Sequence, residues 1–212
     1  MGDRAIITTR EKTLAVYMHW RGGRDTVEPL LHYCKLKGYR APTEDCYGWA
    51  RLCQVIGNYL GGTLSVGIDS YDRAPWADDN GEYIIDGWRI ADRVLPFNGY
   101  VEAQKLDFGN VLMSINRSMP YCEWLNEDYL LSEEVAVSSL RIGDEVWLVD
   151  SFGECGHYSG AGFGDRELAH VDVSGRPYLA AYGKDGFDSY LPNYLLRETC
   201  QIKERANGSS HG

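Results

Sequence analysis

The residues best suited to bind a ligand lie in one short segment, residues 19–26, with the sequence HWRGGRDT. A predicted strand leads into Gly22 and Gly23 and a helix begins directly after them, so free N–H groups at the start of this helix would attract an anion. Arg21 and Arg24 add guanidinium groups that suit a phosphate or a carboxylate. The candidate ligand-binding residues are His19, Arg21, Gly22, Gly23, Arg24 and Thr26.

Two other interpretations of this segment stay open. It could be a tight turn whose arginines pair with neighbouring acids such as Asp25 and Glu28, or it could be a patch that contacts another protein. The segment contains neither the G-x-x-x-x-G-K-[ST] pattern nor the G-x-G-x-x-G pattern, so no nucleotide motif identifies a ligand.

A second candidate region is acidic and aromatic, and it surrounds the dipeptide Asn80-Gly81. This dipeptide predicts a hairpin turn whose second arm covers residues 82–90. Aromatic side chains beside charges are typical of binding hot spots, and carboxylates can imitate phosphates. A solvated hairpin face is the plainer interpretation, and the spacing differs from that of an EF-hand calcium loop. The candidate partner-binding residues are Asp72, Trp76, Asp78, Asp79 and Glu82, which we expect to be exposed together.

The cysteines do not predict a metal centre. Cys34, Cys46 and Cys53 are spaced too irregularly for paired zinc ligands, and the sequence Cys155-Gly156-His157 has no second ligand pair nearby. We therefore expect no metal site, no cofactor and no catalytic residue. A Cys–His nucleophile stays open in principle, because such partners can be distant in sequence.

The elements that position these residues follow from periodicity and caps. An aromatic-rich strand is predicted at residues 13–20, and amphipathic helices at 26–37, ending at Gly38, and at 45–60, ending at Gly61. Strands are expected at 64–68 and in the run VLMSI at 111–115, and a short helix around 121–130.

From about residue 133 the pattern changes to short strands separated by turns, with a glycine-rich loop at 153–164. Such spacing is typical of a small β-barrel. The expected fold class is α+β: an N-terminal lobe with two adjacent helices and a mainly antiparallel sheet, followed by a small barrel-like lobe. The predicted boundaries are 1–131 for the first lobe, 135–204 for the second and 205–212 for a disordered tail.

Composition and charge limit the classes of function that the chain can have. The chain has 212 residues and a net charge of −10, which argues against direct binding of nucleic acid. It is 44% hydrophobic, yet no run approaches the roughly 18 apolar residues that span a bilayer. No apolar secretory core is present at the N-terminus, so we expect a cytoplasmic protein with reduced cysteines and no membrane contact.

Two segments carry a resemblance. VYMHWRGGRDTVEPLLHYCKLKGYR and YGWARLCQVIGNYLGG resemble uncharacterised proteins of phages and other mobile elements from gut bacteria, while LRIGDEVWLVD resembles the opening of an SH3-like small barrel. The resemblance implies a context in which such proteins act against host defence or on host machinery.

Three functions are therefore compared. The first is a non-enzymatic accessory protein that binds and inhibits a host defence or nucleic-acid-handling protein through the acidic, aromatic-rich surface. The second is a binder of a phosphorylated signalling nucleotide at residues 21–26. The third is an enzyme centred on His19 or on Cys155 and His157. The charge and the absence of a catalytic motif favour the first.

Overall fold

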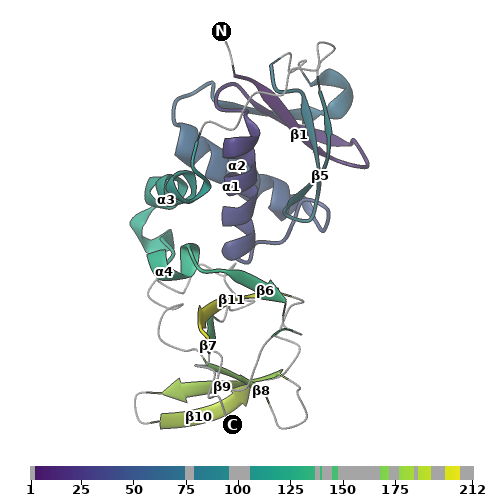
Figure 1. The fold of residues 1–212 in the computed structure, drawn as a ribbon. Coiled ribbons are helices and arrows are strands. Elements are labelled where there is room, and N and C mark those ends of the chain that lie inside the picture. The colour runs from purple at the N-terminus through teal and green to yellow at the C-terminus, as the bar shows by residue number, and fades with distance from the viewer. Residues whose placement is uncertain are drawn as a thin grey trace. The chain divides into compact units, whose positions relative to one another are not determined.

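The structure is a computed structural model that describes residues 3–74, 79–95, 106–136, 139, 145–147, 168–171, 177–183, 186–191 and 199–205. The chain divides into two compact units, residues 1–124 and 125–212 (Figure 1). The sequence placed the boundary a little further along the chain, between residues 131 and 135.

The first unit is built on a five-stranded sheet. Its strands are β1 (Ala5–Thr9), β2 (Leu14–Met18), β3 (Val66–Ser70), β4 (Glu82–Asp86) and β5 (Arg89–Val94), in the order β3-β2-β1-β4-β5. The neighbours β1 and β4 are parallel, and the other three neighbouring pairs are antiparallel. The prediction of a mixed α/β unit with a mainly antiparallel sheet is confirmed.

The central strand β1 was not predicted. All five of its residues are buried, so its sequence AIITT shows no alternation of apolar and polar positions, which is the usual signal of a strand with one solvated face. Ile7 of β1 lies beside Val16 of β2 and Tyr83 of β4, and all three are fully buried. The helices α1, α2 and α3 lie on one side of this sheet (Figure 1).

The first two helices match their predictions closely. Helix α1 covers Arg24–Leu36, and Gly38 just beyond its end has φ +70°, the left-handed conformation that glycine adopts most readily. Helix α2 covers Cys46–Leu60, and the Asp45 side chain caps it by accepting hydrogen bonds from the first-turn N–H groups. Local signals sufficed because caps and apolar stripes lie within each helix.

The run VLMSI was predicted as a strand, and this is wrong. It lies in helix α3 (Phe108–Ser118), where the Asp107 carboxylate accepts a hydrogen bond from the Asn110 N–H as the N-cap. Val111, Leu112 and Ile115 are buried, and their spacing of one and three residues is that of a helix face. A short apolar run alone does not distinguish the two structures.

The Asn80-Gly81 hairpin is also wrong. Strand β4, which follows this dipeptide, pairs with β1 on one edge and with β5 on the other, so no edge is left for an arm preceding Asn80. The hairpin is instead formed by β4 and β5, and Gly87, with φ +59°, lies in its turn. Asn80 is buried and donates to the Asp3 carboxylate, so it anchors the chain to the residues before β1.

Two 3-10 turns and one short helix lie near the ends of the described strands and helices. The 3-10 turns η1 (Tyr71–Arg73) and η2 (Tyr121–Glu123) lie in the first unit, and α4 (Glu127–Leu130) begins the second. The helix predicted around residues 121–130 is thus a turn and a short helix. None of the helices in the described residues is long and apolar enough to cross a membrane.

The described residues of the second unit form two three-stranded sheets. One has the order β6-β11-β7 and the other β10-β9-β8. The strands are β6 (Glu134–Ala136), β7 (Glu145–Trp147), β8 (Leu168–Val171), β9 (Pro177–Gly183), β10 (Gly186–Leu191) and β11 (Thr199–Glu204). The glycine-rich loop and residues 206–212 lie outside the described residues, and the barrel stays a prediction.

Candidate functional site

The glycine turn between β2 and α1 is tightly built into the sheet. The Gly22 N–H donates to the Asp3 carbonyl at 2.6 Å, and the Gly22 carbonyl accepts from the buried Tyr83 hydroxyl at 3.0 Å. A Cβ added at Gly22 would lie 2.6 Å from the Cβ of Ala5 and 2.7 Å from the Ala5 nitrogen. This glycine therefore permits a close approach to β1, and its N–H is already used.

The start of α1 is also engaged within the chain. Arg24 forms an exposed ion pair with Glu28 one turn later, with Nε and Oε2 3.1 Å apart. The Asp25 carboxylate accepts from the Leu106 N–H, and Thr26 is buried. Gly23 is the N-cap, in an extended conformation. These contacts fit the interpretation of residues 19–26 as a tight turn whose arginines pair with neighbouring acids. No contact supports the anion site, which stays a prediction.

Three residues shortly before the glycines, Tyr17, His19 and Trp20, contact one another in sequence. The Tyr17 hydroxyl and the His19 Nδ1 are 3.1 Å apart, and the His19 ring meets the Trp20 ring edge-on, with centroids 4.3 Å apart. Trp20 nevertheless remains 49% exposed. The His19 N–H donates to the Ser65 carbonyl, one step beyond Met18 and Val66, the last paired residues of β2 and β3. Leu64, which precedes Ser65 at this end of β3, is 81% exposed.

Arg21, which follows Trp20, has an unusual backbone conformation. Its φ is +53°, which is uncommon for a residue with a side chain. The guanidinium donates to the Tyr59 hydroxyl at 2.6 Å and lies 5.3 Å from the centre of that ring, near the end of α2. Two sets of contacts, Tyr17–His19–Trp20 and Arg21–Tyr59, adjoin at the peptide bond between Trp20 and Arg21. Together with Leu64 at this end of β3, these residues are called the Trp20 cluster below.

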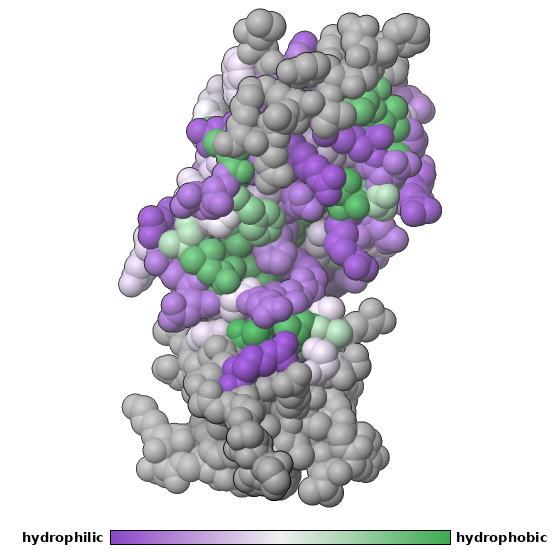
Figure 2. All heavy atoms as spheres, in the orientation of Figure 1, coloured by the Kyte–Doolittle hydropathy of each residue, from purple (hydrophilic) through white to green (hydrophobic). Residues whose placement is uncertain are grey.

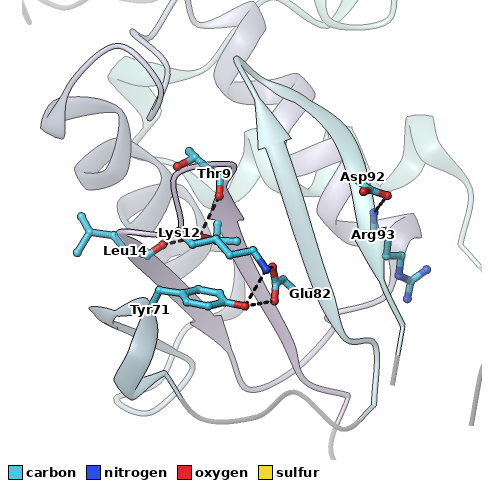
Figure 3. A network of polar contacts seen from close by, with 8 residues as sticks. Thr9, Lys12, Leu14, Tyr71, Glu82, Asp92 and Arg93 are labelled. Carbon is cyan, nitrogen blue, oxygen red and sulfur yellow. Dashed lines mark hydrogen bonds and ion pairs between the residues drawn. The ribbon is translucent and has the colours of Figure 1, made fainter. Parts of the chain in front are cut away.

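The predicted acidic surface is largely engaged inside the first unit. The Asp79 carboxylate accepts from the Arg4 backbone and side chain, and these bonds lower the pKa of Asp79. The Glu82 side chain, only 13% exposed, forms an ion pair with Lys12 at 2.9 Å and accepts from the Tyr71 hydroxyl at 2.6 Å (Figure 3). The expectation that these two acids are openly exposed together is wrong.

The Lys12 ammonium completes this network. It donates to the Tyr71 hydroxyl at 3.0 Å, and this bond, with the Glu82 carboxylate, raises the pKa of Lys12. Of the other predicted partner-binding residues, Asp72 lies exposed in η1, just after β3. Trp76 and Asp78 lie outside the described residues.

Three further residues with shifted pKa values, Tyr33, Lys37 and Tyr39, are buried in the core of the first unit. Burial raises the pKa of Tyr33 and Tyr39, and it lowers the pKa of Lys37, whose ammonium donates to the Glu123 carbonyl at 2.9 Å. The Tyr33 hydroxyl donates to the same carbonyl. These residues fasten α1 to η2. Within the described ranges, no group of three metal-ligating side chains is assembled.

On the face drawn in Figure 2, hydrophobic areas of the described residues remain separated by hydrophilic ones. An exposed apolar side chain is therefore taken as part of a binding site only where it adjoins aromatic or charged side chains, as at the Trp20 cluster. Sequence analysis found His19 and Arg21 but missed Tyr59 and Leu64, because these join the cluster through strand register and helix packing. No protein family, curated protein or solved structure matches the chain.

Proposed function

We propose that this chain is an accessory protein of a mobile element that acts by binding, without catalysis, and that it inhibits a host defence or nucleic-acid-handling protein. The observation that carries the proposal is the Trp20 cluster. Trp, Tyr and Arg are the residue types that most often dominate binding energy at protein interfaces. Here Trp20 is 49% exposed, and its neighbour in the chain, Arg21, donates to the Tyr59 hydroxyl.

The cluster is also held in place before any partner arrives. Trp20 is held by the His19 ring, which is itself held by Tyr17, and the Arg21 guanidinium is held by Tyr59. Side chains that are already ordered lose less rotamer entropy on association, so more of their contact energy remains as affinity. An exposed Trp and an exposed Leu, by contrast, contribute little to the stability of the fold.

The proposal moves the main contact away from the predicted acidic surface. Asp79 and Glu82 are paired with Arg4 and Lys12, so using them for a partner would first require breaking bonds within the first unit. Asp72 remains an exposed carboxylate in η1, at the end of β3 remote from the Trp20 cluster. The nucleotide alternative has no comparable support, since the Gly22 N–H is already donated.

The test compares two exposed aromatic residues that each contact another side chain, Trp20 the His19 ring and Tyr47 the Arg40 guanidinium. Trp20→Ala removes the centre of the cluster. Tyr47→Ala is the matched control, because Tyr47 is 56% exposed on α2 and has the Arg40 guanidinium 4.9 Å from its ring centre. Partners are captured from host lysate with the wild-type chain, identified by quantitative mass spectrometry, purified and titrated by calorimetry.

A partner that binds through the cluster should lose about thirtyfold or more in affinity with Trp20→Ala, the effect of a hot-spot residue of about 2 kcal/mol. Tyr47→Ala should leave the affinity unchanged within about twofold. The proposal also predicts that Trp20→Ala abolishes inhibition in a host interference assay. Equal capture and equal inhibition by all three proteins would contradict it.

A further inference from the structure

Strand β3 forms one edge of the five-stranded sheet, and hydrogen bonds at its two ends show which of its residues direct their backbone groups toward β2. The His19 N–H donates to the Ser65 carbonyl, and the Tyr71 N–H donates to the Thr13 carbonyl. Hydrogen-bonded pairs alternate along an antiparallel ladder, so the pairs between these two ends follow the same phase. The odd-numbered residues of β3 therefore direct their backbone groups toward β2.

The even-numbered residues direct theirs to the open side. At Ser70 the N–H is satisfied locally, because it donates to the Asp69 carboxylate at 2.7 Å. Val66 and Ile68 thus present their N–H and C=O groups outward, and no described strand pairs with them. An edge of this kind is a template for a further strand.

The side chains on this edge favour the same conclusion. Val66 and Ile68 are two positions apart in β3, so they project to one face of the sheet. That face is the helix side, because Ile68 and Val66 lie beside the buried Val16 and Met18 of β2. Ile68 is 53% exposed. The apolar face therefore continues past the last strand, where a further strand could cover it.

The opposite edge shows how an edge is normally protected. Strand β5 carries exposed charges, the Arg93 side chain bonds to the Asn80 carbonyl, and the register of β5 against β4 shifts between Ile84 and Ile85. Charges and irregular pairing blunt strand addition. The register of β3 against β2 is unbroken.

We propose that β3 binds an extended segment of a partner protein, which adds to the sheet as a sixth strand. This inference rests on the proposed function and gives its mode, since the bond from the His19 N–H to the Ser65 carbonyl brings the part of this chain that holds Trp20 to one end of this edge. The segment would have apolar residues at alternate positions to cover Ile68, and a basic residue to meet Asp72 at the other end. A second copy of the chain is a poor occupant, because each copy carries a net charge of −10.

The probe is the fluorescein-labelled peptide acetyl-Lys-Val-Thr-Val-Thr-Val-Lys-amide, titrated by fluorescence anisotropy. Strand addition depends mainly on backbone bonds, so a generic alternating peptide is suitable. Ile68→Pro removes the outward N–H, and proline is tolerated on an edge strand where the N–H faces solvent. Ile68→Thr keeps the N–H and the β-branched shape, and serves as the matched control. Circular dichroism melts confirm that both variants fold.

Ile68→Pro should weaken peptide binding at least tenfold and Ile68→Thr at most threefold. In hydrogen exchange by NMR, the peptide should protect the Val66 and Ile68 amides, whereas Gly67 should be protected without it. Absence of binding at millimolar peptide, or equal binding by the proline variant, overturns strand addition. So does sedimentation showing a wild-type dimer that Ile68→Pro makes monomeric, since the occupant is then a second copy.

The two proposals fail in different ways. If Trp20→Ala weakens partner binding while Ile68→Pro does not, the partner uses the Trp20 cluster and strand addition is wrong. If the peptide binds wild type tenfold more tightly than Ile68→Pro while Trp20→Ala leaves partner capture unchanged, the edge binds a strand and the role of Trp20 is wrong.

Discussion

Gly22→Ala is expected to destabilise the first unit because the glycine touches backbone that cannot move easily. The added methyl group would lie 2.6–2.7 Å from atoms of Ala5 and Arg4, well inside van der Waals contact. Ala5 is fully buried and opens the central strand β1. Relief of the clash would also displace the Gly22 carbonyl from the Tyr83 hydroxyl.

The expected cost is that of overpacking, about 1–3 kcal/mol. Loss of the buried hydrogen bond from Tyr83 would add about 1 kcal/mol if the carbonyl moves out of reach. For a chain of this size, each kcal/mol lowers the midpoint of thermal unfolding by about 2–4 °C. The variant should therefore melt several degrees below the wild type.

Gly23→Ala is the control for this prediction. Its added methyl group would meet only the Asp25 side chain, with Oδ1 at 2.7 Å, and a partly exposed side chain shifts at less cost than the backbone of β1. Gly23 already has φ −62°, which alanine adopts without strain. We expect a loss below about 1 kcal/mol, the usual cost of a poorer N-cap. Thermal melts followed by circular dichroism decide: a Gly22→Ala midpoint within 1 °C of wild type would refute the close approach and leave room for a ligand at this backbone.

Three further predictions follow from the buried groups. Lys12→Met should cost about 1–3 kcal/mol in urea unfolding, because the partly buried Glu82 carboxylate loses its cation; a loss below about 0.5 kcal/mol would mean that the pair behaves as an exposed one. Burial raises the pKa of Tyr33 above its ordinary value of 10.0, so the stability that this phenol contributes is intact below pH 10 and is lost as the pH rises further; ultraviolet titration should show tyrosines that ionise only on unfolding. A brief iodoacetamide pulse mapped by mass spectrometry should modify the exposed Cys122 and spare the buried Cys34, whose pKa burial raises; equal modification of both would contradict the packing of α1.

How far the fold could be predicted depended on how local each signal was. Helix α2 was found because Asp45 and Gly61 mark its two ends within the sequence. The parallel pairing of β1 with β4 joins residues more than seventy positions apart, and no pattern within either strand predicts it. The Asn80-Gly81 hairpin failed for this reason, since β1 occupies the edge that the expected first arm required.

The candidate site divides in the same way. His19, Arg21 and the two glycines could be chosen from the sequence, because a strand, a turn and a helix follow one another there. The sequence does not show which of these residues keep a group free for a ligand. Asp3 and Tyr59, from elsewhere in the chain, form the hydrogen bonds with Gly22 and Arg21. A basic residue in a sequence is a candidate for an external anion only until its partner within the fold is known.

The distribution of charge connects the acidic composition with the proposed binding mode. Residues 1–124 carry 14 basic and 16 acidic side chains, whereas residues 125–212 carry 7 and 15, so most of the negative charge belongs to the second unit. Charge acts over about 8 Å at physiological salt and mainly raises association rates, while aromatic and backbone contacts set dissociation. A basic partner would then be attracted by the net negative charge of the chain and retained at β3 and the Trp20 cluster. Raising the salt concentration should slow association, and Trp20→Ala should speed dissociation with little change in the salt dependence; stopped-flow kinetics with the purified partner measures both, and a Trp20→Ala effect confined to the association rate would contradict this division of roles.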